Sequence, residues 1–204
     1  MARPTADLKT RERLLAAALE VFAGRGYHGT TVDDIVAASG TSKGAFYHYF
    51  PSKQGLFLTL LEQLAEMVET TVEAAIGREH GALAKVEAAL RVVLEVVASQ
   101  RDLARILLIE AAALGPAFEQ SRLGIHRRFA TLIQRHLDRA VADGAIPQQD
   151  THTPAMAWIG AINEVITQRL ASGEDLVAVL PGLRTMLLRS IGATLPEANS
   201  PGLT

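Results

Sequence analysis

The stretch TVDDIVAASGTSKGAFYHYF, residues 31–50, determines the fold of the first part of the chain. Apolar residues recur at helical spacing in its first six positions, and Gly40 follows as a turn residue. A second short helix then places Phe46 and Phe50 on one face and polar side chains on the other. An anchoring helix, a sharp turn and a helix with a polar outer face form a helix-turn-helix, which can place one helix in the major groove of DNA.

Helices are also predicted on both sides of this stretch. A first helix over residues 10–25 has Thr10 as a plausible N-cap and a glycine just beyond its end. Pro51 ends the second helix of the stretch, and Ser52 can cap a long helix from residue 53 to about residue 75. The sequence therefore predicts a three-helix head joined by a long helix to the rest of the chain.

The remaining sequence has the periodicity of helices, without strand-like alternation or internal repeats. Further helices are predicted over residues 83–99, 102–113, 116–143, 154–171 and 176–194. Pro181 and Gly182 fall inside the last of these, so that helix is expected either to start late or to kink. The expected fold is all-α with about nine helices: a head at residues 8–60, a body at 61–196 and a flexible tail at 197–204.

Composition restricts the class of protein. The chain has 204 residues and 49% hydrophobic content, which allows a sizeable core. The absence of cysteine excludes disulfides, thiolate zinc sites and cysteine nucleophiles, and it fits a reducing compartment. No uncharged run approaches the roughly 20 residues that span a bilayer, so we expect a cytoplasmic protein without membrane contact, cofactor or metal.

The net charge of −2 is no global signal of nucleic-acid binding. The distribution of charge along the chain weakens this argument against DNA binding. Residues 1–53 carry seven Lys or Arg and five acids, whereas residues 54–204 carry thirteen and seventeen. The basic excess therefore coincides with the helix-turn-helix.

The segment from residue 11 to residue 57, RERLLAAALEVFAGRGYHGTTVDDIVAASGTSKGAFYHYFPSKQGLF, resembles the N-terminal domain of TetR-family transcriptional regulators. The order of its features carries the resemblance: Gly26 and Tyr27 close the first helix, Gly40 makes the turn, and Ser42 opens the next helix. The resemblance implies an all-helical homodimer that binds a palindromic double-stranded DNA operator. It also implies a chain that represses until a small molecule binds the C-terminal domain. Beyond about residue 60 only the helical pattern matches.

The candidate DNA-binding residues lie in and around the two helices of the motif. They are Thr30, Thr31, Thr41, Ser42, Lys43, Gly44, Ala45, Tyr47, His48, Tyr49 and Lys53. Lysines can neutralise phosphates, and hydroxyls, helix N-termini and glycine backbone suit contacts to phosphate oxygens. In similar proteins Tyr47 lies where a residue contacts phosphates or bases, and Ala45 and His48 are placed for base edges. Alternatively the lysines are ordinary solvated side chains, and Tyr49 can belong to the core as Phe46 and Phe50 do.

The candidate effector-binding residues of the body are polar groups on apolar helices and large apolar side chains. They are Met67, Glu110, Phe118, Phe129, Trp158 and Asn163. Alternatively the polar ones lie on an exposed face and the apolar ones in an ordinary core. If a pocket exists, a mainly hydrophobic effector is expected, because no cluster of cations and no metal triad is visible. His126 and His136, ten residues apart, are interpreted as solvated.

The last two helices are the expected dimer surface, as the resemblance implies. Its candidate residues are Ala157, Gly160, Ala161, Leu183, Met186, Leu187 and Ile191. Small residues allow close approach and the larger ones supply apolar area, although burial within one chain is the alternative. We therefore predict a DNA-binding regulator, a repressor rather than an activator. The rival is a DNA-binding interaction protein without an effector, and an enzyme ranks third because no nucleophile, base and orienting group come together.

Overall fold

The structure is a computed structural model that describes residues 4–109 and 115–193 of the chain. These residues form nine α-helices and no strand, which confirms the all-α prediction. The helices are α1 Pro4–Arg25, α2 Val32–Ser39, α3 Lys43–Tyr49, α4 Lys53–Ile76, α5 Ala82–Ser99, α6 Arg101–Leu108, α7 Pro116–Ala142, α8 His152–Ser172 and α9 Leu180–Ser190. None of the described helices is both long enough and apolar enough to cross a membrane.

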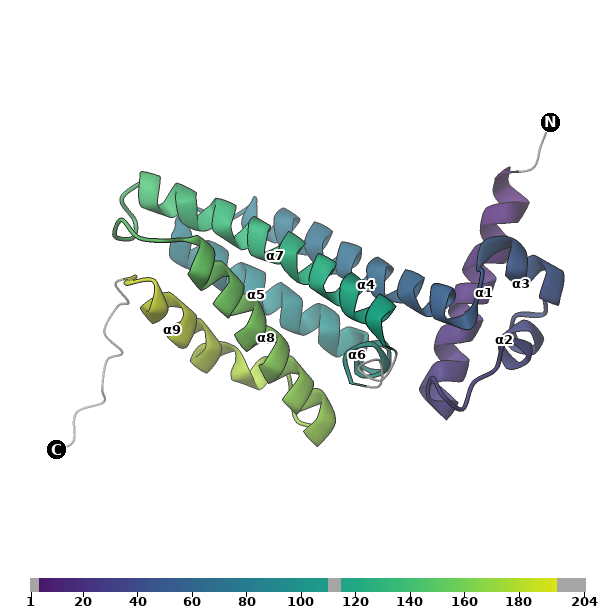
Figure 1. Cartoon of the computed structure of the whole chain (residues 1–204). Helices are drawn as coiled ribbons and strands as arrows, with labels where there is room; N and C mark the ends of the chain where they lie inside the picture. The colour runs from purple at the N-terminus through teal and green to yellow at the C-terminus, as the bar shows by residue number, and fades with distance from the viewer. Residues whose placement is uncertain (1–3, 110–114, 194–204) are drawn as a thin grey trace.

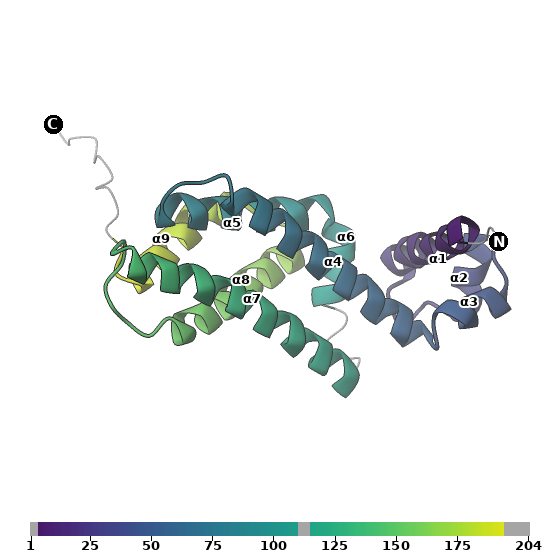
Figure 2. The same ribbon diagram turned by 90° about the horizontal axis from the view of Figure 1, so that it is seen from above.

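The molecule is elongated, with a small head at one end and a larger helical body at the other (Figures 1 and 2). Helices α1, α2 and α3 form the head, and α5 to α9 form most of the body. Helix α4 begins in the head and continues into the body, where it packs on α5 and α7. Its 24 residues span about 36 Å, so one rigid element connects the two parts.

Aromatic side chains hold α4 to the head. The ring centroid of Phe57 in α4 lies 5.7 Å from that of Phe22 in α1 and 4.9 Å from that of Tyr27. Phe57 also lies 6.5 Å from Phe118, at the start of α7 in the body. All four rings are buried, and they belong to one cluster of apolar side chains that continues from the head into the body.

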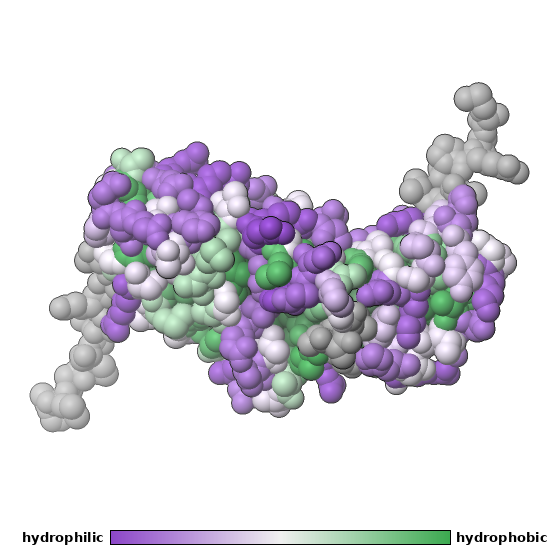
Figure 3. Space-filling view, in the orientation of Figure 1, coloured by the Kyte–Doolittle hydropathy of each residue, from purple (hydrophilic) through white to green (hydrophobic). Residues whose placement is uncertain are grey.

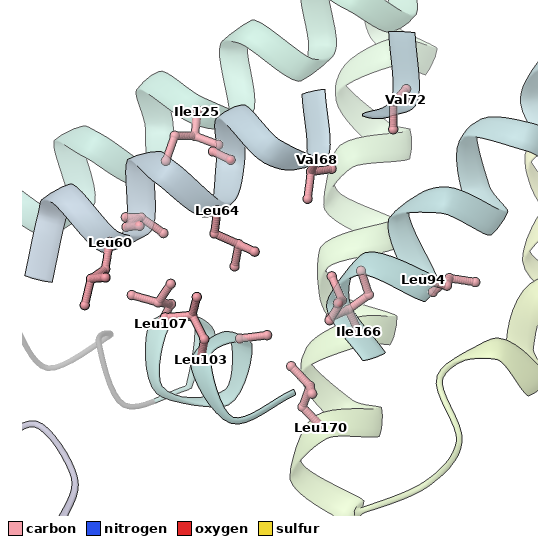
Figure 4. Close-up of a cluster of buried hydrophobic side chains, with 14 of the residues drawn as sticks. Leu60, Leu64, Val68, Val72, Leu94, Leu103, Leu107, Ile125, Ile166 and Leu170 are labelled. Atoms are coloured by element: carbon pink, nitrogen blue, oxygen red, sulfur yellow. The ribbon is translucent and has the colours of Figure 1, made fainter. Parts of the chain in front are cut away.

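The body part of this cluster lies between helices that are distant in the sequence (Figure 4). Leu64 and Val68 project from α4, Leu107 from α6 and Ile166 from α8. Each is almost fully buried, so each contributes on the order of 1.5–3 kcal/mol by leaving water. The buried apolar side chains of α4 therefore form the face with which this helix packs in the body.

Two helix starts differ from the sequence prediction. Helix α1 begins at Pro4 rather than near Thr10, because no helix breaker follows Pro4 and proline suits a first helical turn. Helix α8 begins at His152 rather than at Pro154, because the Asp150 carboxylate accepts hydrogen bonds from the backbone N–H groups of His152 and Thr153 at 2.9 and 3.2 Å.

The last helix starts late. A 3₁₀ turn, η2 Val177–Val179, precedes α9, which begins at Leu180 with Pro181 in its first turn. Proline has no N–H to donate, and that position needs none. Of the two outcomes left open by the sequence, a late start is therefore the one observed.

Gly40 is required for the turn between α2 and α3. Its φ of 60° and ψ of 33° are left-handed, and a Cβ there would lie 3.0 Å from Nη2 of Arg13. We expect Gly40→Ala to lower the free energy of unfolding by about 1–2 kcal/mol, because an L side chain destabilises this conformation. Gly24→Ala is the matched control, since a Cβ at this exposed position in α1 meets nothing within 4 Å. We expect it to stabilise by about 0.5–1 kcal/mol. Equal urea midpoints for the two variants would contradict the requirement for glycine at position 40.

Candidate nucleic-acid interface and internal cavity

The turn between α2 and α3 is held from outside by Arg13. Its guanidinium, on α1, donates to the backbone carbonyls of Ser39 and Gly40 at 2.5 and 3.1 Å. Within the turn the hydroxyls of Ser39 and Thr41 lie 2.7 Å apart. The sequence analysis overlooked Arg13, and its place in the segment of residues 11–57 was the only available signal. This clamp sets the angle at which α3 leaves α2.

The N-terminus of α2 is capped by Thr31. The Thr31 hydroxyl accepts from the N–H of Asp34 at 3.1 Å, and the Asp34 carboxylate accepts from the N–H of Thr31 at 2.8 Å. Hydrogen bonds from Thr31, followed by the charge of Arg25 at 2.8 Å, hold the pKa of Asp34 below its usual value. Thr31 is exposed as expected for a DNA contact, but its hydroxyl already serves as the cap.

Helix α3 exposes the polar face that the sequence predicts. The Ser42 hydroxyl caps it by accepting from the N–H of Ala45 at 3.0 Å. Phe46 and Phe50 are buried in the head core, at 0% and 2% exposure. The exposed positions of the turn and helix are Ser42, Lys43, Gly44, Tyr47 and His48, with Thr41, Ala45 and Tyr49 half-buried.

Tyr47 and Tyr49 differ in their surroundings. Tyr47 is 52% exposed and stands edge-on to Phe46, with ring centroids 5.3 Å apart. Tyr49 packs partly against the core, and its ring centroid lies 4.8 Å from that of His48. Tyr47 therefore presents its hydroxyl outward from the motif, whereas Tyr49 contributes to both the core and the surface.

Lys43 has a carboxylate partner that the sequence analysis did not pair with it. Its ammonium lies 2.8 Å from Asp33 of α2, and both side chains are mostly exposed. The hydrogen bond and the charge of Asp33 raise the pKa of Lys43. Asp33 lies in the first turn of α2, where the helix dipole favours negative charge, and it also pairs with the cation on the polar face of α3. A phosphate at Lys43 would compete with Asp33 for the ammonium.

Two of the predicted DNA-binding residues, Lys53 and Thr30, use their polar groups inside the head. The Lys53 ammonium donates to the backbone carbonyls of Tyr27 and Thr30 at 2.7 and 2.6 Å and lies 4.1 Å from the ring centroid of Tyr27. Burial lowers its pKa. Thr30 is 1% exposed, and its hydroxyl donates to the carbonyl of Gly26 at 2.8 Å. Both residues join the turn before α2 to the start of α4, so their polar groups are used inside the head.

The body has a partly open cavity of about 220 Å³ between α4, α5, α7 and α8. Of its lining side chains, all but four are apolar. Those four are Lys85, His126, His136 and Asn163. Six residues of α4 contribute to the wall, from Leu61 to Ile76. The helix that begins in the head therefore also forms one side of the cavity.

Three of the predicted effector residues lie at this cavity: Phe129, Trp158 and Asn163. Two do not. Met67 is 47% exposed on the outside of α4, and Phe118 is buried against Phe57 at the junction of head and body. The helical spacing that suggested them is shared by core, cavity and surface positions. Glu110 lies outside the described residues.

His126 and His136 are only partly exposed, whereas the sequence analysis interpreted them as solvated. Both are half-buried on α7 and line the cavity. Burial, followed by the charge of Arg122, lowers the pKa of His126. Burial, followed by the charges of Arg135 and two other cations, lowers the pKa of His136. Their spacing of ten residues, nearly three helical turns, places them on one face of α7, and this was the available signal.

The surface of α8 and α9 separates the predicted dimer residues into two groups. Ala157 and Gly160 are exposed, Ala161 is half-buried, and Met186 is 48% exposed. Figure 3 shows a paler, more hydrophobic area over these helices on a largely hydrophilic face. The second group is buried in the core of the chain itself, which is the alternative that the sequence left open: Leu183, Leu187 and Ile191, at 4%, 1% and 2% exposure.

The described residues hold no group of three His, Cys, Asp or Glu side chains that could bind a metal ion.

Two family models match the chain. "Bacterial regulatory proteins, tetR family" matches residues 14–60, and "Tetracyclin repressor-like, C-terminal domain" matches residues 79–167. The first covers the head and the start of α4, and the second covers most of the cavity wall.

The chain is also similar to individual regulators. It is 30% identical over 106 residues to the HTH-type transcriptional regulator RutR of Escherichia coli K12, covering 52% of this chain but only 50% of RutR. Over 185 residues it is 27% identical to the regulator SrpR of Pseudomonas putida, covering 88% of this chain and 85% of SrpR. The structure of FadR from Bacillus subtilis in complex with stearoyl-CoA is similar, with a TM-score of 0.79 and 23% identity. The match covers 88% of this chain and 98% of the FadR chain.

The two lysines of the head have different roles, which substitution can separate. Lys53→Met removes two partly buried hydrogen bonds to backbone carbonyls, so we expect it to lower the free energy of unfolding by about 1–3 kcal/mol. Lys43→Met breaks only an exposed ion pair, so a change below about 1 kcal/mol is expected. Urea unfolding measures both variants. A Lys43 variant as unstable as the Lys53 variant would contradict these roles.

Proposed function

The chain belongs to the TetR family of bacterial regulatory proteins, and we propose that it is a repressor of transcription that a small, mainly hydrophobic effector releases from a palindromic DNA operator. The observation that carries the proposal is the exposed polar face of α3, held by Arg13 at the turn and capped by Ser42. Such a protein acts where bacterial DNA lies, in the cytoplasm.

The DNA-binding unit is residues 8–60, and the effector-binding and dimerisation unit is residues 61–196, with a tail at 197–204. Contacts to DNA come from the exposed part of the predicted set. We assign phosphate contacts to Thr31, Ser42 and Tyr47, because they lie at two capped helix starts and on the exposed face of α3. His48 lies next to Tyr47 on that face and is placed for a base edge.

Homodimerisation through α8 and α9 gives the protein a two-fold symmetry that matches a palindromic operator. The exposed set at Ala157, Gly160 and Met186 supports this, because small residues let two helices approach closely. A two-fold dimer repeats each contact and places two α3 helices about 34–36 Å apart, one turn of DNA. A palindromic site presents the same bases to both.

Release by an effector follows from the position of α4. Its first turns pack in the head through Phe57, and its later turns line the cavity from Leu61 to Ile76. A ligand changes DNA binding only if it binds one arrangement of the heads better than another. A ligand that moves the α4 wall changes the direction in which the head leaves the body. The similar FadR structure is a complex with stearoyl-CoA, a molecule with a long apolar chain, which supports an effector that is largely hydrophobic.

A protein that binds DNA to recruit a partner, without an effector, is the second candidate. It would have a filled body core, and the cavity favours an effector instead. The matching families and relatives are transcriptional regulators and not enzymes.

Tyr47 tests the proposed DNA contact. We expect Tyr47→Ala to weaken binding to the operator by about tenfold to a hundredfold, because a hydrogen bond to a charged group contributes about 1.5–3 kcal/mol. The melting temperature should not change, since the side chain is 52% exposed. Fluorescence anisotropy with the upstream region of the chain's own gene and a random duplex measures the affinity. Tyr47→Phe isolates the hydroxyl. Equal, weak binding of the unmodified protein to both duplexes would refute the regulator.

Met186 tests the dimer surface, and Met67 is its matched control. Both side chains are about half exposed, the first on α9 and the second on α4. Met186→Glu would place a carboxylate and its symmetry copy in the interface, so we expect dissociation to monomers and operator binding weakened at least tenfold. Met67→Glu should leave both unchanged. Sedimentation velocity measures the mass, and a dimeric Met186 variant would contradict this surface.

A further inference from the structure

The polar groups of the cavity lie at separate places along it. His126 and His136 are ten residues apart on α7, which corresponds to about 15 Å along the helix axis. Lys85 lies in the first turns of α5, and its charge contributes to the lowered pKa of His136. Lys85 and His136 therefore share one end of the cavity, near the corner where α4 ends and α5 begins, and His126 lies toward the other end.

The end at Lys85 and His136 is electropositive. Lys85, Arg135 and Arg139 all act on His136 as cations, and the only acid that acts on it is Glu73. Glu73 is already paired with Arg135 at 2.8 Å. Lys85 has no carboxylate partner among the residues that the structure describes. Lys85 is a half-buried residue that lines an apolar cavity, and a cation without such a partner can receive an anion there.

The end at His126 is close to neutral. Arg122, the cation beside His126, is bound by both oxygens of Glu119, at 2.6 and 2.9 Å. Glu119 and Arg122 act on the pKa of His126 in opposite directions. Between the two ends the wall is apolar, with Val72, Ile125 and similar side chains from α4, α5, α7 and α8, apart from the neutral amide of Asn163.

We propose that the ligand of this cavity is an amphipathic monocarboxylate of medium chain length, with its carboxylate at Lys85 and His136 and its apolar chain directed toward Ile125 and His126. Lys85 supplies the charge and up to three N–H donors, and His136 supplies a ring N–H. The cavity of about 220 Å³ exceeds the roughly 150 Å³ that suffices for benzene, so it can hold a chain rather than a single small ring. The inference names the effector class of the proposed repressor and rests on that function only for the link to DNA.

Direct binding to the full chain tests the proposal without DNA. Isothermal titration compares decanoate with 1-decanol, which has the same chain and no charge, at concentrations below micelle formation. We expect decanoate to bind about tenfold or more tightly than 1-decanol, because a charge-assisted hydrogen bond is lost in the alcohol. Equal affinities, or no binding of either compound, would overturn the proposal.

Substitution on α5 tests the position of the carboxylate. Lys85→Met should reduce decanoate affinity to that of 1-decanol and leave 1-decanol affinity unchanged. Arg91→Met is the matched control, because it removes one cation from the same helix at an exposed site paired with Glu87. It should change neither affinity. Retained selectivity for decanoate in the Lys85 variant would overturn the assignment, and thermal melts check that both variants fold.

A parallel titration of operator DNA separates this inference from the proposed function. Specific DNA binding without any decanoate binding would leave the repressor in place and reject the ligand class. Selective decanoate binding without specific DNA binding would establish the ligand class and reject the repressor.

Discussion

The packing of Phe57 is the interaction on which the rest of the structure depends. Its ring is fully buried and touches Phe22 and Tyr27 in the head and Phe118 in the body. Truncating such a side chain typically destabilises a protein by about 3–5 kcal/mol. Because Phe57 belongs to the first turns of α4, the direction of that helix determines both the position of α3 and the shape of one cavity wall.

The cavity leaves apolar side chains of four helices without packing partners on one side. Unfilled volume beside a core lowers stability, because the surrounding side chains lose contacts there. Larger side chains at Ala65, Ala89 or Ala140, which line the cavity, would fill it. Small residues at these positions keep open a space that a ligand can occupy, and a bound ligand returns the missing contacts.

Periodicity was sufficient for the helices and for the two faces of α3, because apolar spacing directly reports which side of a helix is buried. Periodicity could not identify the groups with which a side chain forms hydrogen bonds or packs. Lys53 and Thr30 carry the groups that bind phosphates, yet their atoms meet backbone carbonyls that only the folded turn brings near. Leu187 and Met186 are neighbours with the same apolar character, and the tertiary packing alone decides that the first is buried and the second exposed.

The pairing of Lys43 with Asp33 reconciles a weakly acidic chain with DNA binding. In the unbound head, the cation nearest to the polar face of α3 is neutralised at 2.8 Å, so approach to any phosphate yields little net attraction. Under the proposed contacts, a phosphate would compete with Asp33 for Lys43 while the capped N-termini of α2 and α3 and the hydroxyl of Tyr47 reach their partners together. DNA binding by such a head would depend on the position of α3 more than on charge, and the orientation of α4 sets that position.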